Sequence, residues 1–343
     1  MSLVKKLYEN RNLNDEEFLE LLSDEKYDTE LREYAQKITQ KYYGNKIYIR
    51  GLIEVSNYCK NNCYYCGIRC QNKNVKRYRL TKEEILDACS NGYKLGFRTF
   101  VLQGGEDPIF DTILVDTVKE IRNTYKDCAI TLSLGEKSYE FYKKLYEAGA
   151  NRYLLRHETA DSTHYNQIHP ENMLLETRQQ ALWDLKDIGY QVGSGFMVGS
   201  PYQTNENLLK DIRFLQKLQP AMVGIGPFLT HHDTPFKDME NGSYKMTLKL
   251  LSILRILFPN LLIPATTALN TINKEGRLQG ILSGANVVMP NLSPENAKSN
   301  YNLYDNKLIT GNESAKLVEE LNNELKTIGY EVEVARGDVK KLF

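Results

Sequence analysis

The stretch IYIRGLIEVSNYCKNNCYYCG, residues 47–67, decides between two α/β folds that the sequence could form. It begins as an apolar strand and ends in a loop that carries Cys59, Cys63 and Cys66. An open, doubly wound sheet favours a glycine-rich phosphate turn after its first strand, and here cysteines follow instead. The stretch therefore favours a closed barrel, with the open sheet as the alternative.

Outward from this stretch, short apolar runs alternate with helical patterns. Strands that alternate with helices of about 10–15 residues indicate parallel βαβ units. Eight such units predict one α/β domain, a (β/α)8 barrel of the TIM type. The expected strands are 47–55, 98–103, 129–134, 152–156, 191–199, 222–226, 261–266 and 285–290, and the expected helices are 81–96, 111–125, 138–149, 174–189, 205–218, 244–258 and 274–284.

The two ends of the chain lie outside this pattern. Residues 1–45 predict an N-terminal helical extension, and the barrel is expected over residues 46–291. Residues 292–343 predict a C-terminal tail that packs on the barrel and holds one last helix over 313–329.

Composition and charge limit the partners and the compartment. The 44 basic and 44 acidic residues cancel, so the chain offers no net field for nucleic acid or an anionic membrane. The most apolar stretch, 248–269, is interrupted by Arg255, Pro259 and Pro264, so we expect no membrane span. We expect a cytoplasmic protein, because the N-terminus has no signal or transit pattern.

Four of the six cysteines fall between Cys59 and Cys70, which suggests a metal site in a reducing compartment. In the C-x3-C-x2-C spacing, three thiolates can hold three irons of a cubane cluster and leave the fourth iron open to a small chelating molecule. The alternative is a structural zinc site with Cys70 as fourth ligand, in a non-catalytic scaffold protein. Cys89 and Cys128 are expected to be small buried hydrophobic residues.

In a barrel of this type, chemistry belongs at the carboxyl ends of the strands. Gly104 and Gly105, followed by Glu106, would let the backbone approach a ligand. Arg156 and Glu158 share a face, because strand side chains alternate with period two. They predict either an internal ion pair or a site for a zwitterionic ligand.

Other polar or soft side chains are placed near the same end. Arg178 could bind a carboxylate there, or it could be a surface charge on its helix. Met197 could form a wall for adenosine or methionine, or it could be ordinary core. The hydroxyls of Thr266 and Thr267 could bind an anion or a substrate carboxylate.

The cysteine spacing, with Tyr65 before the last cysteine and QGGED at 103–107, is similar to that of radical S-adenosylmethionine (SAM) enzymes. Nearly the whole chain resembles the HydE family of FeFe-hydrogenase maturases. This resemblance rests on the segments IRGLIEVSNYCKNNCYYCG, VLQGGEDP, TLSLGE, RYLLRHETA, MVGIGPF, PATTA and GANVVMPN.

The resemblance implies a radical SAM enzyme that cleaves SAM reductively to a 5′-deoxyadenosyl radical. Its cofactors would be SAM and a 4Fe-4S cluster on Cys59, Cys63 and Cys66. It would help to assemble the di-iron subcluster of the hydrogenase H-cluster on a small cysteine-bearing iron carbonyl/cyanide substrate, with a reductant protein and other hydrogenase maturases as partners. SAM-binding residues would be Tyr65, Gly104, Gly105, Glu106, Ser133, Arg156, Glu158, Arg178, Met197 and Tyr301, and the substrate cavity would include Thr131, Thr266 and Thr267.

In one respect this sequence differs from some of the enzymes that it resembles. No cysteine follows Cys128. Some members of the family that this chain resembles hold an auxiliary cluster with C-terminal cysteines, and such a cluster is excluded here. The same absence argues against biotin synthase. Methylornithine synthase shares the barrel and the cysteine spacing and stays the alternative enzyme.

Overall fold

The computed structural model describes residues 2–308 and 316–340. Its central element is a six-stranded parallel sheet, so the carboxyl ends of these strands meet at one edge. Along the sheet the order is β2 (Gly51–Ser56), β3 (Thr99–Gly104), β4 (Ala129–Ser133), β5 (Arg152–Leu154), β6 (Gln191–Ser194) and β8 (Met222–Val223).

Shorter strands form two smaller parallel sheets beside this one. β1 (Lys46–Ile49) lies between β10 (Val287–Val288) and β11 (Glu331–Glu333), and β7 (Met197–Val198) pairs with β9 (Gly226–Pro227). Single parallel bridges join Met222 to Leu262, Pro264 to Val287, and Leu52 to Asn291. The pairing therefore continues from β8 past β10 and back to β2.

The prediction of a strand over residues 261–266 is wrong in its extent. Only Leu262 and Pro264 make bridges there, and no continuous strand forms. Proline lacks the backbone N–H that a continuous hydrogen-bond ladder between strands needs, so the pairing at Pro264 is limited to single bridges. The other seven expected runs each contain at least one strand.

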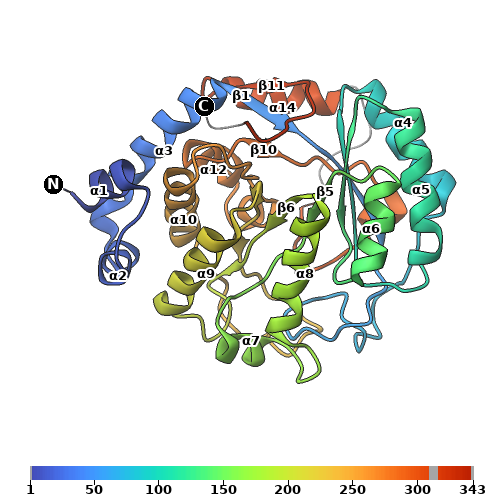
Figure 1. Cartoon of the computed structure of the whole chain (residues 1–343), viewed down its shortest axis with the longest axis horizontal. Coiled ribbons are helices and arrows are strands. Elements are labelled where there is room, and N and C mark those ends of the chain that lie inside the picture. Colours follow the sequence, from blue (N-terminus) through green and yellow to red (C-terminus); the bar gives the residue numbers. More distant parts are fainter. Residues whose placement is uncertain (1, 309–315, 341–343) are drawn as a thin grey trace.

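Seven helices follow the strands and surround the sheet (Figure 1). Several begin at an N-cap whose side chain accepts a backbone N–H, as Thr81 does from Glu84, and Gly189 (φ 106°) ends one of them in the left-handed conformation. Their bounds are α4 (Lys82–Lys94), α5 (Asp111–Thr124), α6 (Tyr139–Glu147), α8 (Leu175–Ile188), α9 (Asn205–Leu218), α10 (Tyr244–Leu257) and α12 (Gly276–Leu282). Three short helices were not expected: α7 (Ser162–Ile168), α11 (Thr267–Ile272) and α13 (Glu295–Lys298).

The N-terminal residues form α1 (Leu3–Asn10), α2 (Asp15–Ser23), a 3-10 turn (Glu25–Tyr27) and α3 (Asp28–Tyr43), and α3 packs on α10. The last helix, α14 (Lys316–Lys326), is described from Lys316, so the expected residues 313–315 lie outside the described part. None of the helices described is long and apolar enough to span a lipid bilayer. In Figure 1 the loop that follows β2 and helix α7 lie at the same end of the molecule.

Candidate active site

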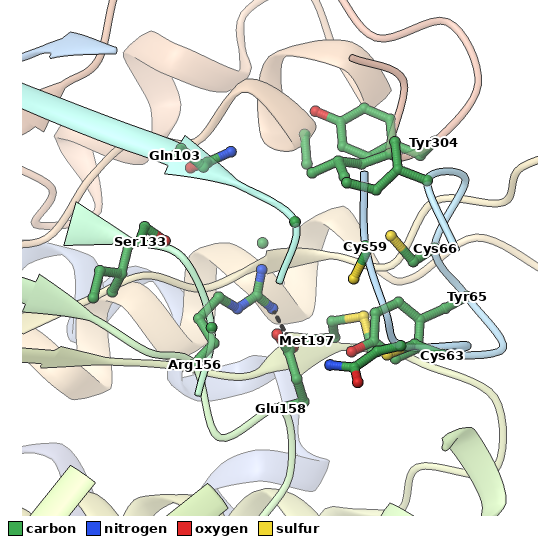
Figure 2. Close-up of a pocket in the computed structure, with 18 of the residues that line it drawn as sticks. Cys59, Cys63, Tyr65, Cys66, Gln103, Ser133, Arg156, Glu158, Met197 and Tyr304 are labelled. Atoms are coloured by element: carbon green, nitrogen blue, oxygen red, sulfur yellow. Dashed lines mark ion pairs between the residues drawn. The ribbon is translucent and has the colours of Figure 1, made fainter. Parts of the chain in front are cut away.

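A cavity of about 300 Å³ opens at the carboxyl ends of the strands. Cys59, Cys63 and Cys66 enter it from the loop after β2, and side chains from several strands face them (Figure 2). Most of the residues predicted from the sequence line this one cavity: Cys59, Cys63, Tyr65, Cys66, Gly104, Gly105, Glu106, Ser133, Arg156, Glu158, Arg178, Met197, Thr266 and Tyr301.

Two of the predicted substrate residues lie elsewhere. Thr131 borders a small void with Arg50 and Arg152. Thr267 lines a neighbouring cavity of about 260 Å³, and Thr266 borders both that cavity and the main one. The cavity wall at the end of the seventh expected strand is therefore shared between two spaces.

The cysteine sulfurs do not surround a single point closely in this structure. Across the described residues, no three of the cysteine sulfurs lie within 4.8 Å of one another. A tetrahedral zinc ion with Zn–S bonds of about 2.3 Å holds its sulfurs about 3.8 Å apart. As placed, the three thiols therefore do not form a mononuclear zinc site.

Burial keeps the three thiols protonated when no metal is bound. Burial raises the pKa of the Cys66 thiol to about 12, and it also raises the pKa values of Cys59 and Cys63. A bound metal stabilises thiolates directly, so binding at this loop must release protons.

The glycine tract after β3 supports the cysteine loop itself. A Cβ on Gly105 would lie 2.2 Å from the Tyr58 carbonyl oxygen and 2.7 Å from the Cys59 Cβ. The Lys60 N–H donates to the Glu106 carbonyl at 2.9 Å. Glycine is therefore required at 105 because the cysteine loop packs directly on this backbone.

The segment at the end of α7 holds the other side of the loop. The Tyr64 N–H donates to the Ile168 carbonyl (3.1 Å), and the Tyr65 hydroxyl lies 3.0 Å from His169 Nε2. His169 Nδ1 lies 3.0 Å from the Tyr165 carbonyl, so Nδ1 carries the proton and Nε2 accepts from Tyr65. Burial, with the nearby charge of Arg178, lowers the pKa of His169 to about 3, which keeps it neutral.

Arg156 and Glu158 form an ion pair that faces the cavity, with 3.0 Å between Arg156 Nη2 and Glu158 Oε2 (Figure 2). Apart from this contact, Arg156 Nε and Nη2 and Glu158 Oε2 are buried and have no hydrogen-bond partner within the described residues. Buried polar atoms are normally satisfied. The structure therefore confirms the first alternative that the sequence left open, an internal ion pair, and a zwitterionic ligand at this place stays a prediction.

Arg178 is buried at this site, so the interpretation of it as a surface charge is wrong. Its Nε lies 2.7 Å from Glu136 Oε1, and its Nη2 lies 3.6 Å from Glu106 Oε1. Burial opposes its charge, but Glu136 and Glu106 outweigh burial and hold the pKa of Arg178 above its ordinary value. Glu136 was not predicted as a partner.

The C-terminal tail closes one side of the cavity. Tyr301 is buried there, and Tyr304, which was not predicted, lines the same space. The Gly67 N–H donates to the Leu303 carbonyl at 2.9 Å, which ties the tail to the cysteine loop. Asp305 lies 2.7 Å from His232 Nδ1 and joins the tail to the loop after β9.

Comparison with known proteins agrees with this geometry. The model of the Radical SAM superfamily matches residues 53–215. The FeFe hydrogenase maturase subunit HydE of Thermotoga maritima is 44% identical over 309 residues, 89% of this chain and 88% of that protein. The 3-methylornithine synthase of Methanosarcina acetivorans is 30% identical over 309 residues, 89% and 87% of the two chains. The solved structure of methylornithine synthase (PylB) matches with a TM-score of 0.84 and 29% identity over 97% of both chains.

Proposed function

Because the chain belongs to the HydE family of radical SAM enzymes, we propose that Cys59, Cys63 and Cys66 hold its 4Fe-4S cluster and leave one iron for SAM. This assignment is favoured over a zinc site because no three cysteine sulfurs of the described residues lie within 4.8 Å of one another. When bound, the cluster supplies the electron that cleaves SAM to methionine and a 5′-deoxyadenosyl radical.

Arg156 and Glu158 are proposed to bind the amino acid part of SAM. Their unpartnered atoms offer both donors and an acceptor, which match a carboxylate and an ammonium group. This ion pair, facing three thiols across one cavity, is the observation that carries the proposal. Arg178 takes part only if SAM displaces Glu136, which lies 2.7 Å from it.

The remaining assignments concern the walls of the cavity. Tyr65 and Met197 would contact the apolar parts of SAM, since Met197 belongs to a buried apolar cluster and the partly buried Tyr65 packs against it. Gly104, Gly105, Glu106 and Ser133 would lie beside the ligand, with Tyr301 reaching in from the tail. Thr266, and through the neighbouring cavity Thr267, would face the substrate, whereas Thr131 would contribute only if that space extends toward Arg50.

We further propose that the strands close into a (β/α)8 barrel over residues 46–291, flanked by the helical extension 1–45 and the tail 292–343. The bridges from Met222 to Leu262, Pro264 to Val287 and Leu52 to Asn291 support this closure. A closed barrel suits the chemistry because a primary carbon radical must meet one oriented partner away from water.

The proposed role is maturation of an FeFe-hydrogenase. The substrate is inferred to be a small iron carbonyl/cyanide complex that carries cysteine, with a reductant protein and other maturases as partners. The 44% identity to a HydE favours this role over a methylornithine synthase, which is 30% identical. The TM-score of 0.84 to PylB keeps the second role as the alternative.

The test is SAM cleavage by the anaerobically reconstituted, chemically reduced protein. The expected result is 5′-deoxyadenosine, with formation stimulated by the iron complex. Stimulation by lysine instead would indicate the methylornithine synthase activity. Colourless protein that holds one zinc ion and leaves SAM intact would support the scaffold alternative.

A further inference from the structure

Glu158 has a backbone conformation that its residue type rarely adopts. Its φ is 65°, in the left-handed region that favours glycine. Such a conformation persists only where the surroundings fix it. The Glu158 N–H donates to the Gly195 carbonyl at 3.1 Å, and the residues on both sides of Glu158 are held as well.

A single carboxylate oxygen holds both flanks of Glu158. Asp211 Oδ1, from helix α9, accepts the Ala160 N–H at 2.6 Å and lies 3.2 Å from His157 Nε2. Asp211 and His157 are fully buried, and neither lines the cavity. Arg156 and Glu158, on either side of His157, do line the cavity.

The far side of His157 is fixed as well. Its Nδ1 lies 2.9 Å from Ser194 Oγ, and the Ser194 hydroxyl donates to the Leu155 carbonyl. Because that hydroxyl has one hydrogen, its oxygen accepts from His157 Nδ1–H. A second proton must then lie between His157 Nε2 and the Asp211 carboxylate. The hydrogen bonds therefore run without a break from Ser194 on β6 to Asp211 on α9.

We propose that Asp211 is a positioning residue that holds Glu158 in the orientation in which it meets SAM. The inference rests on the proposed function in one respect, the binding of SAM by Glu158. Asp211 acts from outside the cavity, through His157 and the backbone of Ala160. Removing its carboxylate takes this support from both flanks of Glu158, so the bond of the Glu158 N–H to Gly195 no longer suffices to hold the side chain in its orientation toward SAM.

The test is a double-mutant cycle on SAM affinity, measured by anaerobic calorimetry with the cluster-loaded protein. We expect D211A and E158A each to raise the Kd for SAM about tenfold or more, with iron content unchanged. The double variant should bind no more weakly than E158A alone, because both changes remove the same contact. Independent, multiplying effects of the two substitutions would overturn the proposal.

Two further variants separate positioning from simple stability. D211N keeps an oxygen for the Ala160 N–H and should restore the Kd to within about threefold of wild type. N286A removes a buried side chain that accepts the Ile263 N–H at the start of β10, far from Glu158, and should lower stability without changing SAM affinity. If D211A does not fold, S194A replaces it in the double-mutant cycle with E158A. Independent effects of S194A and E158A on the Kd for SAM would also contradict the proposal. An unchanged Kd for E158A would refute the SAM-binding role of Glu158 instead.

Discussion

Cys59, Cys63 and Cys66 are the residues on which the proposed chemistry depends most directly. All three line the cavity, whereas Cys70, four positions after Cys66, is not among the lining residues. The Cys70 N–H donates to the Asn61 carbonyl at 2.9 Å, so its backbone shapes the loop. The structure thus separates three ligand candidates from one neighbour.

Replacing any one of the three with alanine should remove the cluster, because each would hold a different iron. We expect iron in C59A, C63A or C66A to fall from about four per chain to below one, with loss of SAM cleavage. C70A is the matched control and should keep most of both. Equal losses in C70A would restore the four-thiolate site.

At the scale of the elements, α7 and the segment after it shape the site as much as the strands do. The segment reaches the cysteine loop through Ile168 and through His169, whose imidazole accepts from Tyr65. A neutral imidazole is needed for this bond, because a protonated Nε2 cannot accept. The contact is therefore sensitive to acid.

The pKa of His169, about 3 in the folded protein, lies below its ordinary value of 6.5. The neutral His169 therefore stabilises the fold fully above pH 6.5, and this stabilisation is lost as the pH falls toward 3. Between pH 7 and 5.5 the unfolding free energy of wild type should fall by about 1 kcal/mol relative to H169Q. Denaturant unfolding at both pH values measures this difference.

The control for that experiment has the opposite sign. The hydrogen bond to Asp305 raises the pKa of His232, so that histidine stabilises the fold more as the pH falls. The gap between wild type and H232Q should therefore widen toward acid. A gap for H169Q that is constant with pH would contradict the neutral state assigned to His169.

The sequence predicted the elements with long periodic patterns better than the short ones. Seven of the eight predicted strand segments contain a strand. Helix α7 was missed because it has only seven residues, too few to show a periodic apolar stripe. At the site, the three cysteines and the Arg156–Glu158 pair were readable from local spacing. His169, Glu136 and Asp211 were not, because only the fold brings them to their partners.

At the scale of the whole molecule, the tail is bound to the first strand of the sheet. Lys307 forms an ion pair with Glu54 on β2, and its Nζ also donates to the Tyr301 carbonyl at 2.7 Å. Glu54 is buried, which raises the pKa of its carboxyl although Lys307 counteracts the effect. The ion pair therefore holds Tyr301 over the cavity.

Removing Lys307 leaves the buried Glu54 carboxylate without its ion-pair partner. K307M should lower the unfolding free energy by about 3 kcal/mol, and E54Q/K307M should recover at least half of the loss. K245M is the control, because Lys245 and its partner Glu25 are both 71% exposed, and it should change little. No loss in K307M would contradict the fixed tail.

The central claim is that SAM completes the coordination of the cluster in this cavity. The most direct measurement is electron–nuclear double resonance on the reduced protein with SAM labelled by nitrogen-15 at its amino group. A nitrogen hyperfine coupling is the result predicted. A cluster signal that SAM leaves unchanged, with no nitrogen coupling, would contradict the claim.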